Sequence, residues 1–167
     1  MSVLIYPHQF DASHLHFGTA ISNNDIANSK FARIVYSTKN ISFNGVGVVI
    51  NLAGSKHEHH YNKIFMWFDP ALPVNQIIAS QLHAIECKII NNYVDAVIGS
   101  PRRCVHLLTN QFNIGCIKTY INDSGLARGT PNDNAMTNAN GNQIMLKICG
   151  VWETNDECGI TYKYIKC

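Results

Sequence analysis

Apolar and polar residues alternate along several segments of the chain, and other segments are short runs of β-branched and aromatic residues. Both patterns are typical of β-strands, because successive side chains of a strand point to opposite faces of a sheet. The acidic, polar segment 153–157 separates the last two such segments and predicts a hairpin there. The predicted strands cover residues 31–37, 45–53, 61–68, 103–109, 115–121, 144–152 and 159–165.

One segment has helical spacing instead. Pro70 and Pro73 precede it, and proline is common where helices begin. We therefore expect a helix near residues 74–91. Its apolar residues recur at intervals of three and four positions, at Val74, Ile77, Ile78, Leu82, Ile85 and Ile89.

The segment 122–143 is rich in Asn, Gly, Asp, Ser and Pro and predicts a long loop between two strands. Loops of this length are either functional or disordered, and the sequence leaves both open. No repeat or linker divides the chain, so we expect a single domain over residues 1–167. We expect an α+β fold that is mainly β and contains one helix.

Composition limits the partners. Charged residues make up 14% of the chain, against about 25% in average proteins. Thirteen Lys and Arg against eleven Asp and Glu give a formal net charge of +2, so no strong field covers the whole surface. A nucleic-acid site would have to be a local basic patch.

The chain has the features of an intracellular protein. Its N-terminus lacks a basic and apolar signal sequence, and no apolar run approaches the roughly 18 residues of a membrane span. Its six cysteines are widely spaced without a CxxC pair, which favours reduced thiols. We therefore expect an intracellular protein of the cytoplasm or nucleus that does not contact a membrane. If the protein is viral, these would be the compartments of the host cell.

The segment 61–68 carries the clearest functional pattern. Alternation places Tyr61, Lys63, Phe65 and Trp67 on one face of the strand, and leaves Ile64, Met66 and Phe68 for the core. Aromatic rings interleaved with a cation suit single-stranded nucleic acid, because bases stack on rings while lysine meets phosphate. The alternative is that both faces are buried.

Further basic and aromatic residues would extend this surface if their strands neighbour one another. Arg102 and Arg103 form a basic turn that could clamp phosphates, or a solvated pair without a ligand. Tyr162, Tyr164 and Lys166 crowd the C-terminal strand. The remaining candidates are Lys118, Tyr120, Lys147, Trp152 and Lys163.

The C-terminal third resembles a known family. The segments LKICGVWET at 146–154 and GITYKY at 159–164 are similar to the ending of single-stranded DNA-binding proteins of large DNA viruses. GCIKTY at 115–120 is similar to a segment found before the long loop in the same proteins. The resemblance implies an OB-like β-barrel and a role in DNA replication or recombination, with the nucleic acid crossing the strand surface. The low net charge departs from that pattern, and self-association into a homo-oligomer or a partner protein would supply further affinity.

Other chemistry has weaker support. The cluster His57, His59 and His60 could bind a metal, yet it reads better as a solvent-exposed polar turn without one. Cys104 and His106 would share a strand face, but nothing indicates an activated thiol. No P-loop, GxSxG, HExxH or deaminase motif is present, so we expect neither an enzyme nor a cofactor.

The leading hypothesis is therefore single-stranded DNA binding, with RNA as an open alternative because stacking and phosphate contacts serve both. The second is a viral structural or assembly protein with a β-sandwich fold, whose exposed aromatic residues make protein contacts. The third is a metal-dependent enzyme centred on His57 and His59.

Overall fold

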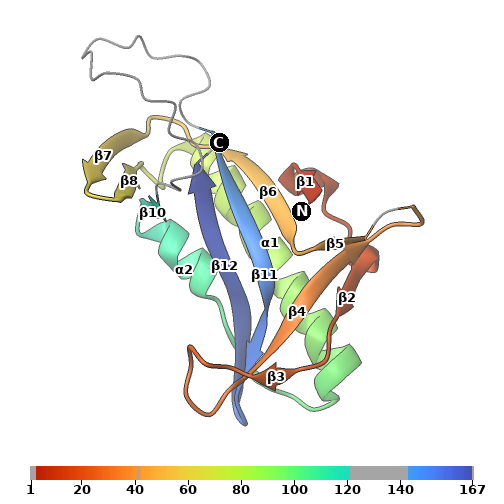
Figure 1. Ribbon diagram of the computed structural model, residues 1–167. Helices are drawn as coiled ribbons and strands as arrows, with labels where there is room; N and C mark the ends of the chain where they lie inside the picture. The colour runs from red at the N-terminus through yellow and green to blue at the C-terminus, as the bar shows by residue number, and fades with distance from the viewer. Residues whose placement is uncertain (1–2, 41, 121–142, 167) are drawn as a thin grey trace.

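The computed structural model describes residues 3–40, 42–120 and 143–166. Within these residues twelve strands form one large, open, mixed sheet, and two α-helices lie against it (Figure 1). The predicted mainly β, α+β class is confirmed. The predicted OB-like barrel is wrong, because the sheet does not close on itself, and the alternative of a two-sheet sandwich does not describe the single sheet either.

The main path of hydrogen-bonded neighbours through the sheet runs β1-β6-β11-β12-β10-β8-β7. β4 leaves this path at β11 and also pairs with β2, β3 and β5, while β9 pairs with β12. The strands are β1 (Val3–Ile5), β2 (Leu15–Phe17), β3 (Ile21–Ser22), β4 (Lys30–Ser37), β5 (Ser42–Asn44), β6 (Val46–Asn51), β7 (Lys56–His60), β8 (Lys63–Trp67), β9 (Arg103–Val105), β10 (Cys116–Tyr120), β11 (Gln143–Glu153) and β12 (Glu157–Lys166).

The centre of the sheet is the predicted C-terminal hairpin of β11 and β12. Its turn is held by Thr154, whose amide donates to the carbonyl of Glu157 over 2.8 Å. A bulge between Ile148 and Gly150 divides β11, so that its first half pairs with β6 and its second half with β4. Gly150 fits there because a Cβ atom would collide with the carbonyl of Ala32 and the ring of Phe31.

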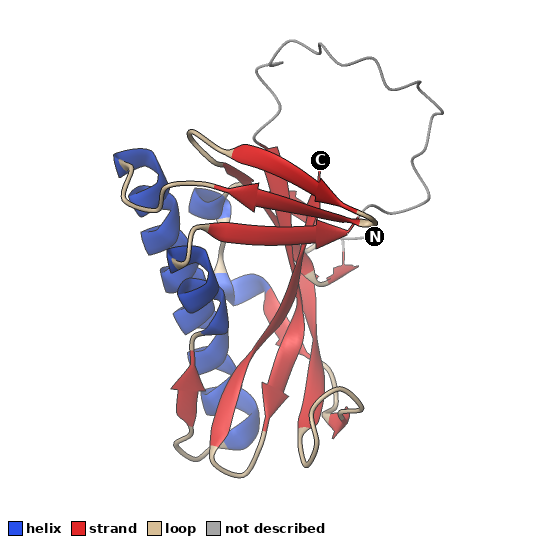
Figure 2. Ribbon diagram, turned by 90° about the vertical axis from the view of Figure 1, so that its left-hand side faces the viewer, coloured by secondary structure: helices blue, strands red, loops and turns tan. Residues whose placement is uncertain are grey.

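The predicted helix is confirmed as α1 (Pro73–Tyr93), which continues through a π-helical turn, η3 (Val94–Ile98), to Gly99 at a φ of 68°. Its apolar stripe, which includes Leu82, Ile85 and Ile89, is buried against the sheet. Both α1 and the shorter α2 (Leu107–Asn113) lie on one side of the strands (Figure 2). In the described part of the chain, neither α-helix lies on the opposite side of β11 and β12.

Two predictions about local structure are wrong. The strand predicted at 103–109 ends at Val105 as β9, and α2 follows, with Leu108 and Phe112 buried one turn apart. The predicted turn at His57–His60 is strand β7, which pairs antiparallel with β8 at the end of the sheet. The predicted loop at 122–143 lies outside the described residues except for Gln143, which begins β11.

The core lies between the sheet and α1. It is formed by side chains that alternate along the strands, such as Leu146 and Ile148 of β11, together with the buried stripe of the helix. Among the helices of the described residues, none combines the length and apolar character needed to cross a membrane.

Candidate nucleic-acid interface

Strand β8 has the two-faced pattern that its sequence predicts. Ile64 and Met66 are buried, as is Phe68 just after the strand. On the other face Lys63 and Phe65 are half-buried, and Trp67 is 48% exposed. The alternative in which both faces of this strand are buried is therefore wrong.

The order of the sheet brings the predicted basic strands beside β8. β10 pairs antiparallel with β8 and places Lys118 directly opposite Phe65. On the far side of β10, the buried pair Thr119 and Tyr164 joins it to β12, so the exposed residues before them, Lys118 and Lys163, share the outer face.

The same row continues into β11, where Lys147 lies opposite Lys163. Phe65, Lys118, Lys163 and Lys147 thus form one cross-strand row over four neighbouring strands, about 14 Å long at the usual strand spacing. We call the outward-facing group Lys63, Phe65, Trp67, Lys118, Lys147 and Lys163 the lysine–aromatic face. It lies on the side of the sheet away from α1, because its neighbours along each strand are core residues.

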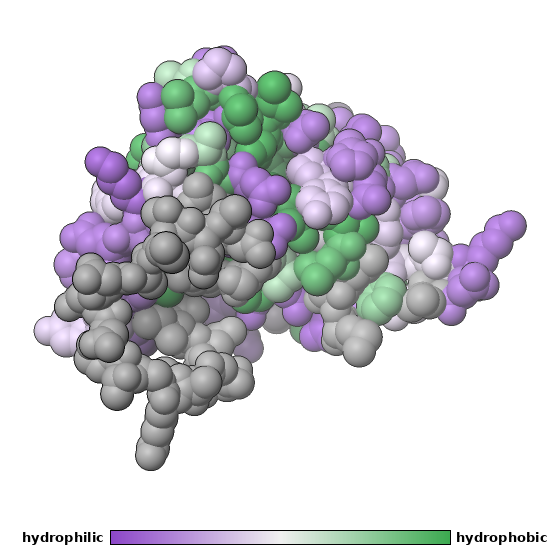
Figure 3. Space-filling view, turned by 90° about the horizontal axis from the view of Figure 1, so that it is seen from above, coloured by the Kyte–Doolittle hydropathy of each residue, from purple (hydrophilic) through white to green (hydrophobic). Residues whose placement is uncertain are grey.

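An open groove of about 410 Å³ lies over the outer side of the β7–β8 hairpin. Its walls are mainly apolar, and its lining residues are Glu58, His60, Tyr61, Asn62, Lys63, Phe65 and Trp67. Seen from above, the surface of the molecule is a mixture of hydrophobic and hydrophilic residues (Figure 3). Such a mixture of apolar surface and dispersed cations suits a ligand that has both rings and charges.

Glu58 orients the aromatic part of the groove. Its Oε2 accepts a hydrogen bond from the Trp67 indole over 3.2 Å, and its Oε1 lies 2.8 Å from Nε2 of His60. These hydrogen bonds, first that with His60 and then that with Trp67, lower the pKa of Glu58 below its usual value. The His60 ring also meets Phe65 edge-on at 5.7 Å between centroids. The carboxylate is therefore engaged with its neighbours, and Trp67 is held with its indole edge turned toward Glu58.

Tyr61 stands at the tip of the β7–β8 hairpin. Its side chain is fully exposed, and its backbone has a φ of 53°, in the left-handed region that tyrosine seldom adopts. A strained, exposed aromatic residue is not explained by packing. It is placed where its ring can meet a ligand that follows the groove.

The face is more basic than the whole protein. Across from Trp67 on β7 lies Lys56, which brings the lysines of this region to five: Lys56, Lys63, Lys118, Lys147 and Lys163. Glu58 is the acidic residue that points outward among them. Five positive charges against one negative charge give a local excess of four, whereas the whole chain has a formal net charge of +2. This is the local patch that a low net charge requires.

Several predicted site residues lie elsewhere. Trp152 is 7% exposed and packs against Gly159, so it offers no ring face to a ligand. Arg103 forms an ion pair with Glu157 at the opposite end of β12, six residues or about 20 Å from Lys163. Arg102 is half-buried and donates to the Ser100 hydroxyl over 2.9 Å. The backbone of Tyr120 pairs with Lys63 on β8, and its side chain lies outside the described residues.

Three residues that the sequence analysis did not predict lie beside the lysine–aromatic face: Lys56, Glu58 and His60. They are alternate positions of β7, and their registers with β8 place them on its outer side. The period of two was present in the segment KHEHH, but the absence of apolar residues made it resemble a turn. His57 and His59 point to the other face, opposite Met66 and Ile64, so the histidine run does not gather on one side.

Comparison with protein-family models finds none that matches this chain, and comparisons with curated proteins and with solved structures also find no match.

Proposed function

We propose that the protein binds single-stranded nucleic acid, and DNA in particular, on the lysine–aromatic face. The row of Phe65, Lys118, Lys163 and Lys147 across four strands is the observation that carries the proposal. The lysines of this row can contact successive phosphates of a nucleic acid that lies across the strands. The aromatic residues at the end of the row can stack on unpaired bases. The resemblance of the C-terminal segments to viral single-stranded DNA-binding proteins points the same way.

Bases would stack on Phe65, Trp67 and Tyr61, each stacked base contributing about 1–3 kcal/mol irrespective of its identity. Phe65 and Trp67 are two positions apart on one strand, so their Cα atoms are about 7 Å apart. The bases of a duplex are already stacked on one another, which makes rings on an open sheet selective for single strands.

Lys63, Lys118, Lys147 and Lys163 would contact phosphates. Each phosphate neutralised on a single strand contributes about −0.7 to the slope of log K against log salt, so four contacts predict a slope of about −2.8. The face would then have modest affinity at physiological salt. An array of such proteins along one strand, through the expected self-association, would increase it.

The test is fluorescence anisotropy of labelled poly-dT, and of a duplex of equal length, titrated with protein over a salt series. We expect binding to the single strand alone, with the slope given above. Trp67→Ala should weaken it by about 1–3 kcal/mol, or roughly 5- to 150-fold. Lys118→Ala or Lys163→Ala should reduce the slope by about 0.7.

Two variants serve as matched controls. Lys88→Ala removes an exposed lysine from α1, on the other side of the sheet, and Tyr6→Ala removes a ring that is 46% exposed near the N-terminus. Neither should change the affinity. Equal losses in the controls and in the face variants would contradict the assignment of the site. Failure to bind either oligonucleotide at low salt, in a protein that forms a salt-insensitive oligomer, would favour the assembly-protein alternative. A parallel titration with poly-U decides between DNA and RNA.

A further inference from the structure

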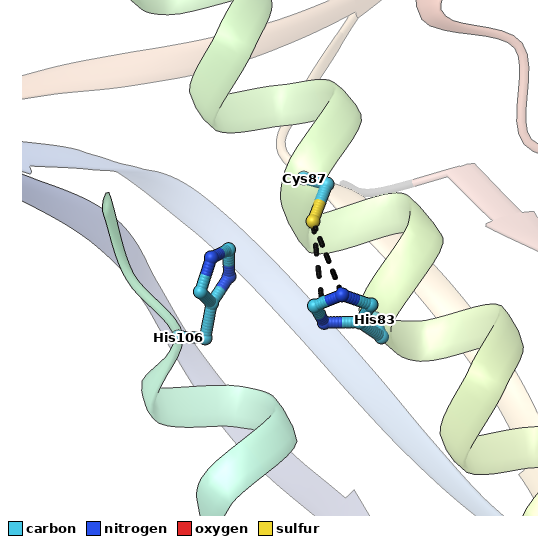
Figure 4. A group of neighbouring side chains, drawn as sticks. All are labelled: His83, Cys87 and His106. Atoms are coloured by element: carbon cyan, nitrogen blue, oxygen red, sulfur yellow. Dashed lines mark hydrogen bonds between the residues drawn. The ribbon is translucent and has the colours of Figure 1, made fainter. Parts of the chain in front are cut away.

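Three side chains with metal-binding atoms meet on the helical side of the molecule, away from the lysine–aromatic face. His83 and Cys87 are one turn apart on α1, and His106 stands immediately before α2 (Figure 4). Their ligand atoms all lie within 4.8 Å of one another. His83 is exposed while Cys87 and His106 are half-buried, so a solute can reach the group.

The distance within α1 already fits a bound ion. The sulfur of Cys87 lies 3.5 Å from Nε2 of His83. Zn–S and Zn–N bonds of about 2.3 and 2.0–2.1 Å at a tetrahedral angle place the two ligand atoms about 3.6 Å apart. His106 would have to move closer by no more than about 1.5 Å, because two nitrogens of a tetrahedral site are about 3.3 Å apart and the three ligand atoms lie within 4.8 Å of one another.

Hydrogen bonds fix His83 in the form that a metal needs. The Thr109 hydroxyl donates to Oε2 of Glu86 over 2.6 Å, so its oxygen is left to accept from Nδ1 of His83, which lies 3.2 Å away. With the proton on Nδ1, the lone pair of Nε2 is free on the side of Cys87. Ligand histidines in metalloproteins are held by the same type of outer contact.

His106 has a related environment. Its Nδ1 is buried and has no hydrogen-bond partner in the part of the chain that the structure describes, and it lies 3.8 Å from Oε2 of the same Glu86. The buried carboxylate of Glu86 thus lies near both imidazole rings: it is hydrogen-bonded to Thr109, which contacts His83, and it is 3.8 Å from His106, beyond hydrogen-bond distance. Carboxylates in this position increase the basicity of ligand histidines.

We propose that His83, Cys87 and His106 bind a divalent transition-metal ion of the Zn²⁺ class, with solvent in the fourth position. Two imidazoles and one thiolate are ligands that Zn²⁺ prefers over the hard cations Mg²⁺ and Ca²⁺. Burial, together with the nearby Glu86 and Cys104, raises the pKa of the Cys87 thiol. Binding therefore displaces the thiol proton to solvent as the sulfur–metal bond forms.

The ion would join α1 to α2. These two helices already lie together, and α2 in turn contacts β10 and β12, two strands of the lysine–aromatic face. The proposal does not depend on nucleic-acid binding, because its ligands point to the other side of the sheet.

The test uses the full chain without an affinity tag. After removal of metals, the protein is dialysed against Zn²⁺ and its metal content is measured. We expect one ion per chain and a higher melting temperature with Zn²⁺ than with Mg²⁺. Co²⁺ should give the intense visible bands of a tetrahedral site and a sulfur-to-cobalt charge-transfer band.

Cys87→Ser and His83→Gln change accessible side chains, and both should abolish the stoichiometric ion. Cys87→Ser should also abolish the sulfur-to-cobalt charge-transfer band. Thr109→Val, which removes only the outer hydrogen bond, should weaken zinc binding about 10- to 100-fold. The controls are Cys149→Ser, a half-buried thiol outside the group, and the double variant His57→Ala/His59→Ala. Zinc that is retained by the Cys87 and His83 variants, or lost from the His57/His59 variant, would overturn the proposal. Loss of poly-dT binding in any of these variants is scored separately and bears on the lysine–aromatic face alone.

Discussion

The substitution Glu86→Ala should destabilise the protein more than any surface change, because this carboxylate caps a helix from a distance. Glu86 has no exposed surface, although it lies on α1. Its Oε1 accepts from the Leu108 amide over 3.0 Å and its Oε2 from the Thr109 amide over 3.1 Å. Two of the free amides in the first turn of α2 are therefore satisfied by a side chain of another helix.

The size of the effect follows from the burial of these donors. A buried donor that loses its partner costs about 1–3 kcal/mol. Leu108 is fully buried and pays the upper part of that range, whereas Thr109 is half-buried and its groups can reach water. We expect Glu86→Ala to reduce the free energy of unfolding by about 3–4 kcal/mol. Glu86→Gln keeps one carbonyl acceptor and should cost about 1–2 kcal/mol.

Equilibrium unfolding in urea, followed by circular dichroism, measures both values. The buffer should contain a chelator, so that a metal at His83, Cys87 and His106 does not contribute. Asp95→Asn changes an exposed carboxylate just beyond α1 and should stay within about 0.5 kcal/mol of the unsubstituted protein. If Glu86→Ala were no more destabilising than Asp95→Asn, the capping role assigned to Glu86 would be refuted.

Two further predictions concern the buried core. Gly150→Ala should reduce the free energy of unfolding by about 1–3 kcal/mol, because the new methyl group collides with the Ala32 carbonyl and the Phe31 ring. Unfolding in urea measures this loss, and Gly18→Ala, whose new Cβ would have ordinary contacts, is the control. Burial raises the pKa values of Tyr93 and Tyr162 to about 12, above the usual value of 10, so the folded state favours the protonated phenols. The stabilisation of the folded state by these protonated phenols is complete below pH 10 and is lost as the pH rises from 10 to about 12. We therefore expect the free energy of unfolding of the unsubstituted protein to fall more steeply over this range than that of Tyr162→Phe.

The strands that were predicted well are those in which one face is buried. In β8, Ile64 and Met66 alternate with residues that stay outside, and this contrast is visible in the sequence because only one side of the strand meets the core. The same contrast located β11 and β12, including the turn between them. The helix α1 was found for the equivalent reason, since its buried stripe repeats at helical intervals.

The elements that were missed depend on contacts with distant parts of the chain. Strand β7 consists of polar residues and is a strand because β8 offers its edge for pairing. Helix α2 is short, and the group that caps it, Glu86, precedes Leu108 by 22 residues in the sequence. No local pattern contains either fact.

The candidate site was predicted in its residue types but not in its extent. Lys118, Lys147 and Lys163 were placed on the same surface as Phe65 only on the assumption that their strands are neighbours, and the sheet order confirms it. Arg103 failed the same assumption because β9 joins the far end of β12. Trp152 was predicted to belong to the site because it is aromatic, but it is buried where β11 pairs with β4, opposite Phe31.

The lysine–aromatic face spans a junction between two parts of the sheet. β7, β8 and β10 form a small three-stranded unit, which in the described part of the chain joins the rest of the sheet through the pairing of Thr119 with Tyr164. Phe65 lies on one side of this seam and Lys147 and Lys163 on the other. A strand of nucleic acid that touches both sides would bridge the junction that has the fewest paired residues in the described part of the sheet. By linkage, binding that requires both sides of the junction to stay paired stabilises the paired state, so bound nucleic acid should make this junction open less often.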